Sequence, residues 1–185
     1  MYNRLELFKK IVATLLGAIL FLAFFMYGRI PSIVPTTYIH LAYGLSAFFG
    51  AVFGPFVSTV MVFLGHLTND IFFYDICWTW IIGSTITGFF SGLPYYHFKL
   101  VEGNKINKYF YIWNIVGHSL AWLIVVPLLD YFLHHEPIET IIAECSVAYI
   151  NNLISSIIIG GIFAFVLIQT KKIKSSFDND NSTNI

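Results

Sequence analysis

The composition of this chain is typical of a protein whose main solvent is lipid. It has 185 residues, of which 57% are hydrophobic and 11% charged, and its mean hydropathy is +0.75. These values exclude an ordinary soluble globular domain. The formal net charge is zero, so the chain has no overall charge that would attract nucleic acid.

Six apolar segments are long enough to cross about 30 Å of hydrocarbon as helices. None of them alternates with a period of two residues, which excludes the strands of a membrane barrel. We therefore expect an all-α membrane protein with six transmembrane helices in a single domain over residues 1–170. The polar segment 171–185 is predicted to be a disordered cytoplasmic tail. The expected spans are residues 11–28, 38–53, 56–73, 78–96, 109–129 and 143–169.

The basic residues of the chain are sorted to one side of this topology. With six spans, the N-terminus, the tight turn at Gly54-Pro55, the loop before Lys108 and the C-terminal tail share one side, and only Arg29 falls on the other. Loops rich in Lys and Arg stay in the cytoplasm, so both termini are predicted to be cytoplasmic. The basic residues on this side are Arg4, Lys9, Lys10, Lys99, Lys105, Lys108, Lys171, Lys172 and Lys174.

The third expected span carries polar residues near its outer end. His66, Asn69 and Asp70 are spaced i, i+3 and i+4, so they share one face of a helix. Ionisable groups in a span are costly and face a cavity or another helix. Solvation of the helix end with an interhelical hydrogen bond, ligand binding and metal ligation all remain open for this face.

Spans four, five and six add further candidates for ligand contact. Trp78 and Trp80 begin span four from the outer side, where they form either an interfacial aromatic belt or a stacking platform for a planar ligand. Polar residues in span five either join helices or reach a pocket floor. In span six, Asn152 belongs to a stripe of small residues that favours helix packing. The predicted substrate-binding residues are Asp70, Trp78, Trp80, Asn114, His118 and Asn152.

Small residues on two spans indicate close helix packing. In span four, Ser84, Gly88 and Gly92 recur every fourth position and predict close backbone approach. In span one, Ala13 and Gly17 form a small patch on a face of larger apolar residues. That patch either packs internally or serves as a docking site for another membrane subunit.

The sequence lacks several motifs that would indicate enzymatic activity. It has no Walker A loop, no His-Glu-x-x-His pair and no Gly-x-Ser-x-Gly elbow, so a partner chain must supply any ATP hydrolysis. We expect a transport subunit that is not an enzyme and needs no cofactor or metal. The alternatives are a metal-dependent intramembrane enzyme that uses His66, Asp70 and His118, together with Glu144, and a purely structural subunit.

Several ordered sequence pieces resemble one known family. They are Phe53-Gly-Pro55, Gly65-His66 followed by Asp70, Trp78-x-Trp80-Ile-Ile-Gly-Ser84, Ala121-Trp122 with Pro127-Leu-Leu-Asp130, and Glu136-Pro137. Over roughly residues 10 to 170 the chain resembles the riboflavin-type substrate-binding (S) components of energy-coupling factor (ECF) transporters, which are bacterial ABC importers.

The resemblance implies a cell-membrane bundle of six helices with an outward pocket for a vitamin, either riboflavin-like or corrinoid. It also implies that a membrane-embedded coupling subunit contacts Ala13 and Gly17, and that two cytoplasmic ATPase subunits drive uptake. The chain has Gly117-His118 and Glu144-Cys145 where the family carries Gly-Asn and Gln-Gly. If these positions line the pocket, the substrate differs from that of the relatives.

Overall fold

The computed structural model describes residues 4–32, 38–96 and 106–182, with side chains as far as Thr170. Lys99, Lys105 and the last three residues of the predicted tail therefore lie outside the described residues. The elements are α1 (Arg4–Tyr27), β1 (Arg29–Pro31), β2 (Tyr38–His40), α2 (Ala42–Phe53), α3 (Pro55–Phe73), α4 (Trp78–Gly92), the 3-10 helix η1 (Leu93–Tyr96), α5 (Lys108–Leu120), the π-helical η2 (Ala121–Val125), α6 (Val126–Leu129), the π-helical η3 (Asp130–His134) and α7 (Ile138–Ser182).

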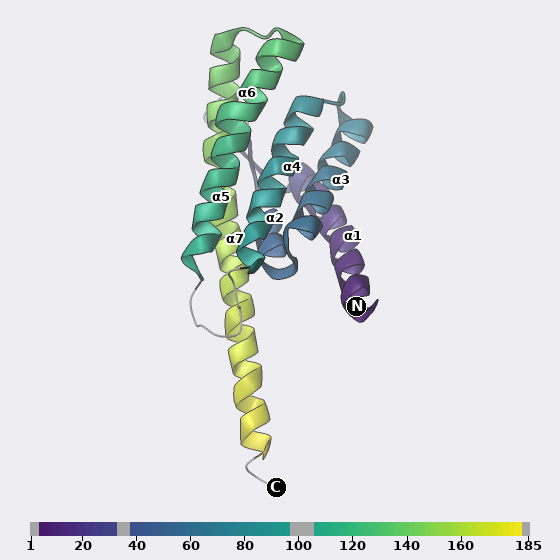
Figure 1. The fold of residues 1–185 in the computed structure, drawn as a ribbon, viewed down its shortest axis with the longest axis vertical. Coiled ribbons are helices and arrows are strands. Elements are labelled where there is room, and N and C mark those ends of the chain that lie inside the picture. Colours follow the sequence, from purple (N-terminus) through teal and green to yellow (C-terminus); the bar gives the residue numbers. More distant parts are fainter. Residues whose placement is uncertain (1–3, 33–37, 97–105, 183–185) are drawn as a thin grey trace.

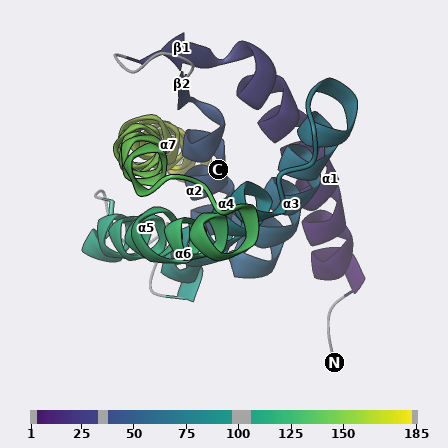
Figure 2. The ribbon, with the colours of Figure 1, turned by 90° about the horizontal axis from the view of Figure 1, so that it is seen from above.

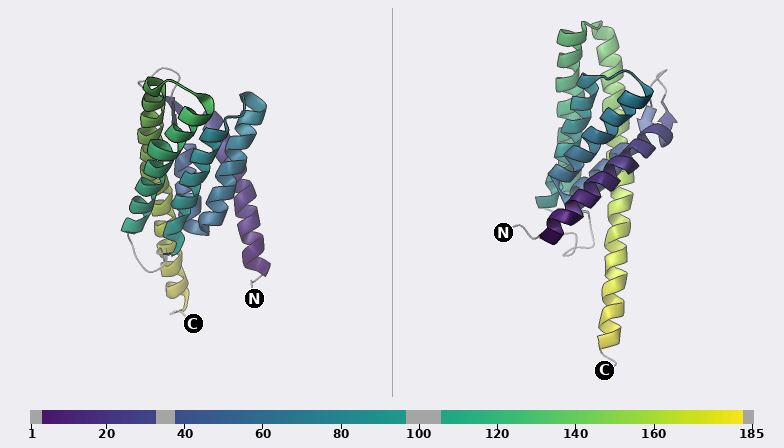
Figure 3. Two further views of the ribbon diagram at one scale, coloured as in Figure 1. Left: turned by 45° about the horizontal axis from the view of Figure 1, so that its top comes forward. Right: turned by 90° about the vertical axis from the view of Figure 1, so that its right-hand side faces the viewer.

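The helices run up and down between two ends of a bundle (Figures 1 and 3). The N-terminal end of α1, the α2–α3 turn and the C-terminal end of α7 lie toward one end. The β1–β2 hairpin, the α3–α4 turn and the α6–α7 turn lie toward the other. Helix α2 lies inside the bundle and contacts α1, α3, α4 and α7 (Figure 2).

The turn between α2 and α3 forms as its residues predict. Gly54 has a φ of 97°, a conformation that only glycine adopts readily, and Pro55 occupies the first turn of α3, where its missing N–H costs no hydrogen bond. The small residues of α4 lie against this region. A Cβ on Gly92 would overlap the backbone of Pro55, and one on Gly88 would lie 2.9 Å from the Ser58 carbonyl oxygen. The predicted close approach is confirmed.

The structure confirms a helical membrane-protein class but not the number of six crossings. Four of the described helices are long and apolar enough to cross a membrane: Arg4–Tyr27, Pro55–Phe73, Lys108–His134 and Ile138–Thr170. At 12 and 15 residues, α2 and α4 are shorter than the roughly 20 residues that a crossing needs. The expected start of span two was wrong, since residues 38–40 form strand β2. Helix α7 continues to Ser182, into the segment predicted to be disordered, and the domain boundary at residue 170 stays a prediction.

The outer surface of the bundle is apolar. Large hydrophobic side chains such as Ile19, Phe56 and Ile158 are more than half exposed, whereas polar side chains such as Ser58, Ser84 and Asn114 are fully buried. This inversion of the usual pattern suits a protein solvated by lipid, where polar groups need partners inside the protein.

Candidate functional site

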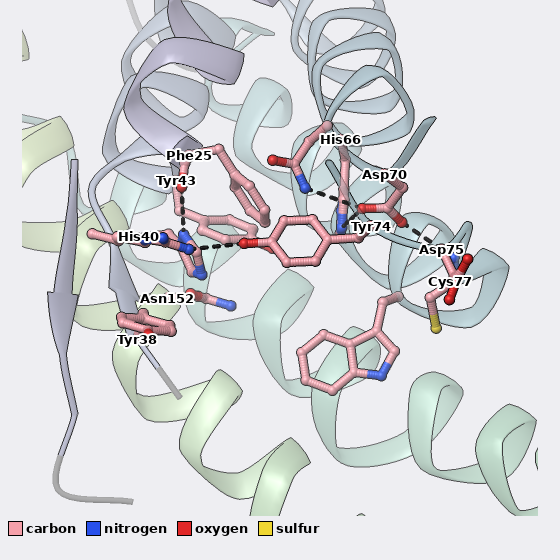
Figure 4. Close-up of a pocket in the computed structure, with 13 residues that line it drawn as sticks. Phe25, Tyr38, His40, Tyr43, His66, Asp70, Tyr74, Asp75, Cys77 and Asn152 are labelled. Carbon is pink, nitrogen blue, oxygen red and sulfur yellow. Dashed lines mark hydrogen bonds and ion pairs between the residues drawn. The ribbon is translucent and has the colours of Figure 1, made fainter. Parts of the chain in front are cut away.

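A cavity of about 340 Å³ lies between the β-hairpin, the α3–α4 turn and the helices beneath them (Figure 4). This cavity, called the main cavity because a smaller one adjoins it, is at the end of the bundle opposite the start of α1 and the end of α7. Its volume is within the range of roughly 300–1,000 Å³ that is typical of small-molecule sites. Five aromatic side chains contribute to its walls: Phe25, Tyr38, Tyr43, Tyr74 and Trp80.

One wall of the main cavity is built around the carboxylate of Asp70. Its Oδ1 accepts a hydrogen bond from Asn69 Nδ2 at 3.1 Å, and its Oδ2 accepts one from the backbone N–H of Cys77 at 3.2 Å. His66 Nε2 lies 3.6 Å from Asp70 Oδ1. The second bond fixes the α3–α4 turn against the end of α3. The predicted shared face of His66, Asn69 and Asp70 is confirmed, since all three are buried and line the cavity.

A chain of hydrogen bonds continues from this wall into the bundle. His66 Nδ1 and Ser84 Oγ are 2.8 Å apart, and Ser84 Oγ is also 2.8 Å from the Tyr43 hydroxyl. The chain links α3, α4 and α2, which restricts the rotamers of two cavity-lining side chains. Such a network holds the site in one arrangement before a ligand arrives.

The hairpin supplies the facing wall. In the β1–β2 pair Arg29 lies opposite His40, and Pro31 lies opposite Tyr38, so the side chains of these four residues leave the same face of the ribbon. That face is the one turned to the cavity, because Arg29, Tyr38 and His40 all line it.

His40 is anchored on the end of α1. Its ring stacks on Phe25 with centroids 4.1 Å apart, and its Nδ1 donates to the Phe25 carbonyl oxygen at 3.2 Å. Burial lowers the pKa of His40 to about 4. The ring is therefore neutral at pH 7, and its Nε2 is a hydrogen-bond acceptor.

Arg29 connects the two loops at the mouth of the main cavity. Its guanidinium lies over the Tyr38 ring, 4.8 Å from the centroid, and donates to the Tyr74 hydroxyl at 2.9 Å. The hairpin and the α3–α4 turn are thus joined across the opening, with the Tyr74 ring extending over the cavity (Figure 4).

Three of the six predicted substrate-binding residues line the main cavity: Asp70, Trp80 and Asn152. Trp78, on the same turn of α4 as Trp80, is 53% exposed and is not among the lining residues. A helix places residues two positions apart on different faces. A ligand contact for Trp78 therefore stays a prediction without support from this geometry.

Asn114 and His118 lie deeper, among other helices. Asn114 Oδ1 accepts from Ser91 Oγ at 2.8 Å, and its Nδ2 donates to the Phe110 carbonyl oxygen. His118 Nδ1 donates to the Asn114 carbonyl oxygen at 2.9 Å, and its Nε2 is 3.2 Å from Ser156 Oγ. Both side chains have partners within the protein, which favours the helix-joining role that the sequence left open.

The small patch of α1 faces inward in this structure. Ala13 is 6% exposed, and a Cβ on Gly17 would lie 2.9 Å from Met61 Sδ and 3.2 Å from the Phe49 ring. The geometry favours internal packing of Gly17 against α2 and α3. A docking role for Ala13 and Gly17 remains a prediction.

Sequence reasoning missed the hairpin and the end of α1 as parts of the site. Phe25, Arg29, Tyr38 and His40 were not among the predicted ligand contacts, although they form the wall opposite Asp70. One signal was present in the sequence: Arg29 is the single basic residue that the predicted topology leaves on the outer side, and an isolated exception of this kind indicates a local role.

The residues of the metal-enzyme alternative do not converge. His66 and Asp70 are neighbours, but His118 is bonded to Asn114 and Ser156. Within residues 4–32, 38–96 and 106–170, no group of three His, Cys, Asp or Glu side chains is arranged to hold a metal ion. A catalytic metal site would need at least three protein ligands, so this alternative is not favoured.

Fold and site together define a helical membrane protein with a ligand-sized, aromatic and polar cavity at one end. The chain belongs to the family described as ECF-type riboflavin transporter, S component, whose model matches residues 7–169. It is therefore a substrate-specificity subunit of a transporter, from a family embedded in bacterial membranes.

Similar proteins occur in several bacteria. A UPF0397 protein of Streptococcus gordonii is 31% identical over 176 residues, which cover 93% of this chain and 94% of that protein. A UPF0397 protein of Lactobacillus acidophilus is 31% identical over 177 residues, covering 94% and 96%. One from Lactiplantibacillus plantarum is 30% identical over 176 residues, covering 93% and 95%. No solved structure matches the chain.

Proposed function

We propose that this S component captures a riboflavin-like vitamin, a planar heterocycle with a polar arm, from outside the cell. In this proposal the chain crosses the bacterial cell membrane several times with both termini in the cytoplasm. A membrane-embedded coupling subunit and two cytoplasmic ATPase subunits supply the energy for uptake, and the chain itself catalyses no reaction.

The main cavity with its aromatic walls is the observation that most strongly supports the proposal. Aromatic side chains bury a large apolar area and favour offset or edge-to-face contact with a planar ring. A cavity of about 340 Å³ is at the small end of ligand sites. It suits a flavin-sized ring system better than a corrinoid, whose macrocycle and nucleotide arm are much larger.

The polar groups of the cavity complement the edge of such a heterocycle. A flavin presents one ring N–H between two carbonyl oxygens. The main cavity offers the Asp70 carboxylate as an acceptor and the neighbouring Asn69 amide as a donor and acceptor. A few placed polar groups in an otherwise apolar site are what fixes the orientation of a ligand.

The position of the cavity supports capture from outside. The sorting of basic residues in the sequence favours a cytoplasmic location for the end that holds the start of α1 and the end of α7. The β1–β2 hairpin and the α3–α4 turn, whose residues line the main cavity, lie toward the opposite end (Figure 3). The acidic residues Asp70 and Asp75 line the cavity.

Equilibrium binding to riboflavin tests this proposal. Flavin fluorescence is measured while the detergent-purified protein is added, and stacking on an aromatic wall is expected to quench it. Trp80→Leu and Asp70→Asn are each expected to weaken binding by about 10-fold, since each removes roughly 1–2 kcal/mol of contact. Glu139→Gln, which neutralises an exposed carboxylate of α7, is the matched control for Asp70→Asn.

Two results would count against the proposal. One is the absence of any quenching at riboflavin concentrations well above those of a high-affinity site. The other is unchanged affinity in both cavity variants, which would move the site elsewhere. A Trp78→Leu variant additionally tests the sequence prediction that this exposed ring contacts the ligand.

A further inference from the structure

A second, smaller chamber of about 150 Å³ adjoins the main cavity. The two share the residues Tyr38, His40, Trp80 and Asn152 as walls. The remaining walls of this side chamber come from α7 alone: Glu144, Val147 and Ala148. None of these three lines the main cavity, so the side chamber extends the site toward α7.

Three of the residues that line the side chamber, His40, Glu144 and Asn152, supply hydrogen-bond acceptors. Asn152 is 3% exposed, and its Oδ1 has no hydrogen-bond partner among the residues that the structure describes. The neutral His40 ring donates through Nδ1 to Phe25, which leaves Nε2 as an acceptor. Glu144 adds a half-buried carboxyl group. A buried acceptor without a donor costs about 1–3 kcal/mol, which a ligand's donor would recover.

Two of these acceptors, Glu144 and Asn152, lie in one row along a face of α7. Glu144, Ala148 and Asn152 are spaced four residues apart on α7, so they follow one another along the same side. Eight residues of α-helix rise about 12 Å. The row therefore begins at Asn152, in the wall shared with the main cavity, and ends at Glu144.

We propose that the side chamber is a separate subsite for the donor-bearing arm of the ligand. This inference rests on the proposed function: the planar ring occupies the main cavity, and a chain of hydroxyl groups extends along α7. Its hydroxyl groups donate to Asn152 Oδ1 and to the Glu144 carboxyl group. A ligand that has the planar ring but no arm supplies no hydrogen-bond donor to Asn152 Oδ1 or to the Glu144 carboxyl group.

The experiment compares two ligands that differ only in the arm. Riboflavin carries a ribityl chain, and lumiflavin has a methyl group at the same ring nitrogen. Both are titrated against the unmodified protein, Glu144→Ala and Val147→Phe. Glu139→Ala, which removes an exposed carboxylate from the same helix, is the control.

The unmodified protein is expected to bind riboflavin about 10-fold or more tightly than lumiflavin, since the arm adds hydrogen bonds to buried acceptors. Glu144→Ala is expected to remove about 10-fold of riboflavin affinity, because a hydrogen bond to the buried side of the carboxyl group is lost. Val147→Phe places a larger side chain in the side chamber and is also expected to weaken riboflavin binding. Lumiflavin affinity is expected to stay within about twofold in all variants, which also reports that each variant is folded.

Three results would overturn the subsite. Equal affinities of the unmodified protein for both flavins would place the arm outside the side chamber. A parallel loss of both ligands in Glu144→Ala and Val147→Phe would show that these residues support the main cavity or the fold. If the unmodified protein binds neither flavin, the proposed riboflavin-like ligand fails, and the arm subsite fails with it.

Discussion

The unpartnered oxygen of Asn152 predicts opposite effects on stability and on binding. Replacing this residue by Leu, which has a similar size, removes a buried acceptor that has no donor among the described residues. Such an acceptor costs about 1–3 kcal/mol. We therefore expect Asn152→Leu to stabilise the ligand-free protein by about 1 kcal/mol, or roughly 2–4 °C in Tm. Riboflavin affinity is expected to fall by about 10-fold, since the ligand loses an acceptor.

The neighbouring residue provides a matched control. Asn151 is also buried, at 7% exposed, but its Nδ2 donates to the Tyr38 carbonyl oxygen at 3.5 Å. Asn151→Leu loses this bond and leaves the carbonyl group without that donor. We expect this variant to lower the Tm, so the same substitution at adjacent positions changes stability in opposite directions.

The assay combines thermal unfolding in detergent with riboflavin titration, both on the same preparations. Thermal unfolding is measured without ligand and at saturating ligand, because a bound ligand adds stability by mass action. The riboflavin-induced rise in Tm is expected to be smaller in Asn152→Leu than in the unmodified protein. A lower ligand-free Tm for Asn152→Leu, or an unchanged riboflavin affinity, would contradict the prediction that this oxygen accepts a hydrogen bond from the ligand.

Two further predictions concern the fold around the site. Gly92→Ala would bring a Cβ into the backbone of Pro55 and is expected to destabilise the protein by about 3 kcal/mol or more. Gly161→Ala, whose Cβ would lie 3.8 Å from its nearest neighbour among the described residues, is expected to be nearly neutral. Equal Tm values for the two variants would contradict the close approach of Gly92 to Pro55. Burial lowers the pKa of His40 from 6.5 to about 4, so the unfolded chain binds the proton first and stability falls as the pH drops from 6.5 toward 4. This amounts to roughly 2 kcal/mol between pH 7 and 5. His40→Gln is expected to make the pH dependence of unfolding shallower by that amount, and an unchanged slope would show that His40 is not buried in its neutral form.

The parts of the fold that follow from local rules could be predicted from the sequence. Long apolar runs predicted helices, because lipid leaves backbone groups no other partners. The Gly54-Pro55 turn and the spacing of small residues on α4 predicted a close contact that the structure contains. The shared face of His66, Asn69 and Asp70 depends only on helical periodicity.

The hairpin wall depends on pairing between distant residues and could not be found in this way. The segment from Tyr38 is apolar enough to continue into α2, so it was assigned to a span. Strand β2 pairs with β1, and its His40 lies opposite Arg29. This pairing is a tertiary feature, and a strand of three residues is too short to show a periodic sequence pattern.

The hydrogen-bond partners of Asn114 and His118 could not be predicted from the sequence either, because they lie on other helices. Asn114 and His118 lie on one face of their helix, but the sequence does not state which helices cover that face. The structure places Ser91 and Ser156 there, and the polar groups are satisfied without a ligand. Asn152 lies in a comparable sequence pattern on α7, but its side chain lines both the main cavity and the side chamber.

Native mass spectrometry measures directly whether the chain binds riboflavin in the main cavity. The protein is purified in mild detergent, incubated with riboflavin and released from the detergent in the mass spectrometer, with Trp80→Leu treated in parallel. The proposed function predicts one flavin bound to each chain and a reduced bound fraction in the variant. A chain that stays free of flavin under these conditions, or that binds it equally in both proteins, would contradict it.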